Sequence, residues 1–127
     1  MENFSNLNWL AVVTGTIVSF LIGWAWYSEK LVGKKWAAGS GVNMDSASKM
    51  PVFAMASQVA ALFLLALVVG LTATVNALFT AILAILAVAT FTASMGGFVK
   101  KSNFAIAVDF FYVIIAGIIL ILCQGIF

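Results

Sequence analysis

Residues 23–36 read GWAWYSEKLVGKKW, and within this stretch the chain passes from apolar to basic sequence. The preceding residues carry no charge back to Glu2, whereas four of the six lysines follow within residues 30–49. Two tryptophans and a tyrosine lie at the crossing, and such amphipathic rings are typical of a membrane–water interface. The stretch therefore predicts the end of a membrane span, with the chain's tryptophans acting as interface anchors rather than as a cage for a cation or pigment.

The composition is that of an integral membrane protein. Of the 127 residues, 65% are hydrophobic and 8% are charged, and the mean hydropathy is +1.19. Soluble domains carry roughly 25% charged residues, so this chain has too few charges to cover a surface facing water. We expect one membrane domain over residues 1–127, and the net charge of +2 gives no indication of a nucleic-acid partner.

Four apolar runs of 21 to 23 residues are each long enough to cross a bilayer at about 1.5 Å per residue. They cover residues 7–27, 51–71, 77–98 and 104–126. Short turns between consecutive spans favour antiparallel neighbours. The fold class predicted is all-α, a membrane-embedded four-helix up-and-down bundle with a longer loop between the first two helices. In that loop, Leu31, Val32 and Trp36 are expected to dip into the interface while the lysines face water.

All six lysines lie in the two loops that four spans place on one side, residues 28–50 and 99–103. The positive-inside rule then predicts that both loops are cytoplasmic and that both termini lie outside. An alternative role for the lysines is to recruit anionic lipid.

Two faces of small residues recur at a spacing of four. They consist of Gly15, Ser19 and Gly23 in the first span and Ala89, Ala93 and Gly97 in the third. Small residues at this spacing let helices approach closely. The faces indicate tight packing inside one protomer or a seam between two copies.

Asp109 lies six residues inside the fourth span, roughly 9 Å below its boundary. A carboxylate near the membrane centre costs about 2.5–3.5 kcal/mol, and less away from the centre. We therefore expect Asp109 to point into the bundle and to accept hydrogen bonds. Depth along each span places a layer of polar groups near it: Trp24, Tyr27, Ser57, Gln58, Ser94 and, one helical turn beyond, Tyr112.

Three interpretations of Asp109 remain open. It can be a polar clamp that fixes helix register, a station in a proton or ion relay, or a contact to a partner subunit or lipid. A relay would be favoured by a second ionisable group inside the spans, and none is present. The clamp is the favoured interpretation.

The sequence offers little for chemistry. It has no histidine, the commonest metal and haem ligand, and its one cysteine, Cys123, cannot form an internal disulfide. No nucleophile–histidine pair, metal-ligand cluster or phosphate-binding loop is present. We expect neither an enzyme nor a cofactor, and Cys123 is assigned to packing or lipid contact.

The pattern Gly23-x-x-Trp26-Tyr27-Ser28, followed by Leu31-x-Gly33-Lys34-x-Trp36, resembles a motif of a bacterial family of small four-span membrane proteins of unknown function. That family carries G-x-x-W-Y-S at the end of its first span and then L-F-G-K-x-W, so Val32 stands in place of phenylalanine. The pair Asp109 and Tyr112 is similar to an acid-or-amide plus tyrosine pair in the family's last span, although Phe111 replaces a small residue. The resemblance implies a prokaryotic inner membrane and no known activity.

The function predicted is that of a non-catalytic membrane subunit, which packs against copies of itself or within a larger membrane complex. Its partners would be the lipid bilayer and other membrane-protein chains. The alternative is a small transporter or channel for protons, ions or a solute that uses the Asp109 layer.

Overall fold

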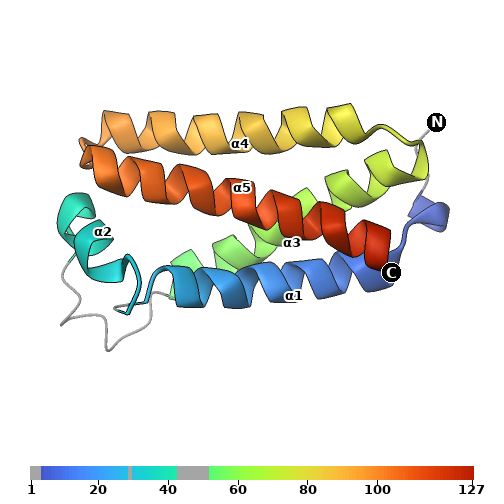
Figure 1. Ribbon diagram of the computed structural model, residues 1–127, viewed down its shortest axis with the longest axis horizontal. Coiled ribbons are helices and arrows are strands. Elements are labelled where there is room, and N and C mark those ends of the chain that lie inside the picture. Colours follow the sequence, from blue (N-terminus) through green and yellow to red (C-terminus); the bar gives the residue numbers. More distant parts are fainter. Residues whose placement is uncertain (1–3, 29, 43–51) are drawn as a thin grey trace.

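The computed structural model describes residues 4–28, 30–42 and 52–127, and over these residues it is helical without a strand. A short 3-10 turn at Phe4–Asn6 precedes five α-helices (Figure 1). The helices are α1 (Trp9–Trp26), α2 (Gly33–Ser40), α3 (Val52–Thr74), α4 (Leu78–Phe98) and α5 (Asn103–Ile126). The all-α fold class with four long apolar helices is confirmed. Glu2, Lys49 and Pro51 lie outside the described residues.

Four of the helices are long and apolar enough to cross a membrane, which indicates a multi-pass membrane protein. They begin and end within three residues of the runs in the sequence, the largest difference being at the end of α3. The turn after α3 places Asn76 in the left-handed region, at φ 54°, and the turn after α4 does the same with Lys100, at φ 58°.

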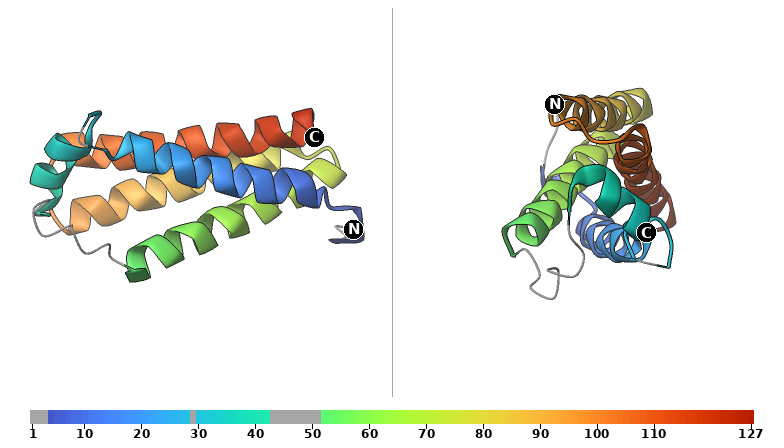
Figure 2. Two further views of the ribbon diagram at one scale, coloured as in Figure 1. Left: turned by 90° about the horizontal axis from the view of Figure 1, so that it is seen from below. Right: turned by 90° about the vertical axis from the view of Figure 1, so that its left-hand side faces the viewer.

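The long helices alternate in direction, so both termini lie at one end of the bundle and α2 lies across the other (Figure 1). Helix α5 packs against both α1 and α4, and α3 packs mainly against α1. Figure 2 shows α3 diverging from the other long helices toward the end that α2 covers. Its first ten residues, 52–61, accordingly contain no buried side chain, and the first one is Leu62.

Small residues of α1 form the seam with α5. Gly15, Ser19 and Gly23 are all buried. A Cβ atom built at Gly15 would lie 2.8 Å from a methyl group of Leu120, and one at Gly23 would lie 2.6 Å from the hydroxyl of Tyr112. This face is therefore used inside the protomer, and it leaves no room for a second copy.

The corresponding stripe on α4 differs from the expectation. Ala89 is fully buried, but Ala93 is half-buried and Gly97 is exposed, with no atom within 4 Å of a Cβ built there. Gly96 takes the packing role instead, because its added Cβ would lie 3.1 Å from Ile106 of α5. A spacing of four drifts around a helix of 3.6 residues per turn, so a stripe that starts buried turns outward within two or three repeats.

Helix α2 was not predicted as a helix. It occupies Gly33–Ser40 in the segment predicted as the longer loop between the first two spans, and it ends where Gly41 adopts the left-handed conformation at φ 72°. Its buried residues are Gly33 and Ala37, and they face the end of the bundle. The helix is therefore held by the protein, with Trp36 directed at α5 rather than free to enter the lipid interface.

Candidate functional site: the Asp109 cluster

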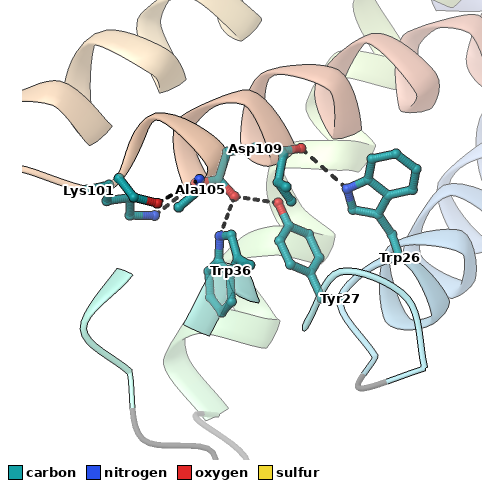
Figure 3. A network of polar contacts seen from close by, with 8 residues as sticks. Trp26, Tyr27, Trp36, Lys101, Ala105 and Asp109 are labelled. Atoms are coloured by element: carbon teal, nitrogen blue, oxygen red, sulfur yellow. Dashed lines mark hydrogen bonds and ion pairs between the residues drawn. The ribbon is translucent and has the colours of Figure 1, made fainter. Parts of the chain in front are cut away.

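Asp109 lies on the first third of α5 with 8% of its surface exposed. Its Oδ1 accepts hydrogen bonds from the Tyr27 hydroxyl at 2.5 Å and the Trp36 indole N–H at 2.8 Å. Its Oδ2 forms an ion pair with Lys101 Nζ at 2.8 Å (Figure 3). We call Trp26, Tyr27, Trp36, Lys101 and Asp109 the Asp109 cluster. Its donors come from the end of α1, from α2 and from the α4–α5 turn.

A second contact ties the same two regions together. The indole N–H of Trp26, the last residue of α1, donates to the backbone carbonyl of Val108 at 3.3 Å. The Tyr27 ring meets Trp36 edge-on at 4.9 Å between centroids, and it meets Tyr112 edge-on at 5.6 Å. The rings of Tyr27, Trp36 and Tyr112 thus pack against one another beside a carboxylate that is largely buried.

The local sequence explains why Tyr27 and Trp36 reach one acceptor. Helix α1 stops at Trp26, and the backbone N–H of Gly33 then bonds to the carbonyl of Ser28 at 2.9 Å. This tight loop carries α2 back toward the end of the bundle. A side chain at position 33 would collide with the backbone carbonyls of Tyr27 and Ser28, so only glycine fits there.

The far end of α2 is attached to α5 as well. The backbone N–H of Ser102 donates to the carbonyl of Gly39 at 2.9 Å, while the Ser102 hydroxyl caps α5 by accepting from the N–H of Ala105 at 3.1 Å. Trp36 and Gly39 thus hold α2 at two points, and the helix closes one end of the bundle.

Tyr112 forms the layer beneath the cluster. Its hydroxyl donates to the backbone carbonyl of Ser19 at 2.9 Å, deep in the seam between α1 and α5. The side chain of Gln58, on α3, lies close to this hydroxyl. The absence of a side chain at Gly23 gives the Tyr112 ring its space.

The predicted polar layer is thus brought together only in part. Tyr27 bonds to Asp109, and Gln58 and Tyr112 lie one layer deeper. The prediction is wrong for the other three expected donors, which do not bond to Asp109. Trp24 is 53% exposed on the outer side of α1, Ser57 is exposed and bonds to the carbonyl of its own helix at Ala54, and Ser94 is exposed on α4. Depth along a span does not give the direction in which a side chain points, and these three side chains point outward.

Two partners of Asp109 were missed. Lys101 was counted among the topology lysines, although it precedes α5 by only two residues and its long side chain can reach back along the helix. Trp36 was assigned to the lipid interface. The available signal was that a buried carboxylate requires a cation nearby, and Lys101 is the nearest one in the sequence.

Three donors of the cluster, on Tyr27, Trp36 and Lys101, bond to the Asp109 carboxylate, and Trp26 bonds to the backbone carbonyl beside it. The Tyr27 hydroxyl has an ordinary pKa of 10.0 and is therefore a donor at neutral pH, and burial and the hydrogen bond to Asp109 raise its pKa further. The Lys101 side chain is 23% exposed and offsets the charge of the carboxylate from the solvent side. Over the described residues, no group of three or more metal-ligating acidic, cysteine or histidine side chains occurs.

Comparison with known proteins assigns the chain to a family. Residues 10–125 match the family described as "Protein of unknown function (DUF1761)". The chain belongs to this family. No match is found among curated proteins, and none among solved structures. In this DUF1761 member, the segment of residues 23–36 and the pair Asp109 and Tyr112, 73 or more positions apart, form one continuous set of contacts.

Proposed function

We propose that this protein is a non-catalytic membrane subunit that assembles with copies of itself through the outward face of α4. Helix α4 is the least buried of the four long helices. Its face opposite α5 is hollowed into a shallow depression, lined by Leu83, Leu86, Ala87, Thr90, Phe91 and Ser94. This depression is the observation that carries the proposal.

The hydroxyl groups in the depression support a protein partner over lipid. Thr92, on another face of α4, donates to the carbonyl of Val88 at 2.8 Å. By contrast, Thr90 and Ser94 have no hydrogen-bond partner within the described part of the chain. Thr90 is eight residues, or about 12 Å, from the end of α4, at a depth where lipid offers no partner. A facing helix would supply one.

A second copy fits this face because a hydroxyl both donates and accepts a hydrogen bond. The same residues can therefore pair with themselves across a two-fold axis. The proposal also moves the seam away from Gly15 and Ser19, which are buried against α5. Residence in a bacterial inner membrane, with the α2 end in the cytoplasm, is part of the proposal and is supported by the lysine distribution.

Transport through the Asp109 layer receives less support. Both carboxylate oxygens are already bonded to Tyr27, Trp36 and Lys101. The depression on α4 is lined by no residue of the Asp109 cluster, and neither is a second depression between the ends of α3, α4 and α5. We therefore propose a structural role for the cluster, in which it fixes α2 and α5 to the end of α1.

Two serine variants test the assembly. Ser94→Leu fills the depression of α4, and Ser57→Leu makes the same change on an exposed position of α3. We expect native mass spectrometry in mild detergent to give an oligomer for the wild type and for Ser57→Leu, and a monomer for Ser94→Leu. A monomeric wild type would overturn the proposal, as would equal oligomers from all three chains. If a different membrane protein co-purifies by binding to α4, that protein is the partner in place of a second copy.

A further inference from the structure

The two lysine-bearing segments lie at the same end of the bundle, where α2 is next to the turn between α4 and α5 (Figure 2). Their connection is the hydrogen bond from the N–H of Ser102 to the carbonyl of Gly39, at 2.9 Å. The side chain of Lys35 also crosses from α2 to α5, with its Nζ 4.3 Å from the centre of the Phe104 ring. Residues about 65 positions apart thus share one rim.

Four cations on this rim have no counter-ion in the described part of the chain. They are Lys30, Lys34, Lys35 and Lys100, and all four are exposed. Lys101 differs, because Asp109 neutralises it. Asp109 is the only acidic residue among those described, and it is buried. We call these four lysines the basic rim.

Apolar side chains accompany the basic rim at the same end of the bundle. Leu31 is 62% exposed beside Lys30, while Phe98 and Val99 are 79% and 66% exposed beside Lys100. Apolar groups next to ammonium groups suit the boundary between acyl chains and headgroups. There the apolar side chains contact the acyl chains and the ammonium groups contact the headgroups. A water-soluble anion would match the charges alone and leave these three side chains in water.

We propose that the basic rim binds the phosphate headgroups of anionic phospholipids. The ammonium groups attract the lipid phosphates, and Leu31, Phe98 and Val99 lie against the first carbons of the acyl chains. The ion pair of Lys101 with Asp109 and the bond of Trp36 to Asp109 hold the two segments in place, so the rim is preformed. This surface is separate from the outward face of α4, and its test does not depend on assembly.

The experiment compares lipid retention by three full-length chains. The wild type, a Lys34→Gln/Lys35→Gln/Lys100→Gln variant and the matched arginine variant are each reconstituted in phosphatidylcholine nanodiscs that contain a fraction of phosphatidylglycerol. Native mass spectrometry after release into detergent then counts the phosphatidylglycerol that stays bound. Circular dichroism verifies that each variant is helical, and Lys101 is left unchanged so that the Asp109 cluster stays intact.

We expect the wild type and the arginine variant to retain phosphatidylglycerol over phosphatidylcholine. The affinity of the glutamine variant should fall about fivefold for each lysine removed. Equal retention by the glutamine variant and the wild type would overturn the proposal. The proposal would also fail if inorganic phosphate, added alone at matched charge, displaced the lipid completely, because the site would then recognise a free anion. A monomeric protein that still retains the lipid would refute assembly and leave this inference standing.

Discussion

The indole N–H of Trp36 donates to Oδ1 of Asp109 at 2.8 Å, across 73 positions of sequence. The bond joins a short helix outside the predicted spans to a carboxylate inside the last one. Because Tyr27 donates to the same oxygen, the segment between α1 and α2 is held at both of its ends. The buried charge therefore fixes the position of a loop as well as the packing of helices.

The ion pair predicts different effects at two adjacent lysines. Lys101→Gln should lower the free energy of unfolding by about 1–3 kcal/mol, because it leaves a carboxylate that is 8% exposed without its cation. Lys100→Asn removes the same charge from an exposed side chain and keeps a residue suited to φ 58°, so it should change stability little. Thermal unfolding in detergent measures both. Equal losses for the two variants would argue against the ion pair.

The tight loop after α1 predicts a severe effect at one glycine. Gly33→Ala places a methyl group against the backbone carbonyls of Tyr27 and Ser28, which cannot move without releasing Tyr27 from Asp109. We expect a loss of about 2 kcal/mol or more. Gly125→Ala, in α5, meets no atom within 4 Å and is the matched control. The melting temperatures of the two variants should differ clearly, and a Gly33→Ala chain as stable as its control would refute this account of the loop.

The Tyr27 hydroxyl predicts a dependence of stability on alkaline pH. Burial and the hydrogen bond to Asp109 raise its pKa above the ordinary value of 10.0 in the unfolded chain. A group whose pKa is raised by folding contributes its full stability below pH 10, and the contribution falls as the pH rises toward the folded pKa. The stability difference between wild type and Tyr27→Phe should therefore be constant up to pH 10 and shrink above it. A difference that stays constant at higher pH would contradict the assignment.

Much of the architecture follows from the sequence because it depends on length and polarity. Runs of more than 20 apolar residues predict helices that span a bilayer, and these helices are observed within three residues of the expected ends. The burial of Asp109 could be predicted in the same way, because an exposed charge at that depth is costly.

The direction of each side chain could not be predicted, since these helices are apolar on all sides. Without a polar face, the sequence does not show which way Trp24, Ser57 or Ser94 points, and all three are turned away from Asp109. A prediction from depth alone therefore grouped these three residues with Asp109 wrongly. The sequence indicates the direction of one face more clearly. That face contains Gly15, Ser19 and Gly23, whose small size is useful only where another helix lies close.

Helix α2 was missed for a different reason. Its eight residues include two glycines and two lysines, and its position depends on contacts with distant residues rather than on its own propensity. The bond of Trp36 to Asp109 and that of Gly39 to Ser102 are both made with α5 or the turn before it. Tertiary contacts of this kind override local preference, and a single sequence does not show them.

The hydrogen bond between Trp36 and Asp109 holds α2 on the bundle, and a double-mutant cycle measures its contribution to stability. The four chains are the wild type, Trp36→Phe, Asp109→Leu and the double variant, each unfolded thermally in the same detergent. We predict a coupling free energy of about 1–3 kcal/mol, because the hydrogen bond between the indole and the carboxylate is lost in either single variant. Additive effects of the two substitutions, with no coupling between them, would contradict the claim that the buried carboxylate holds α2 on the bundle.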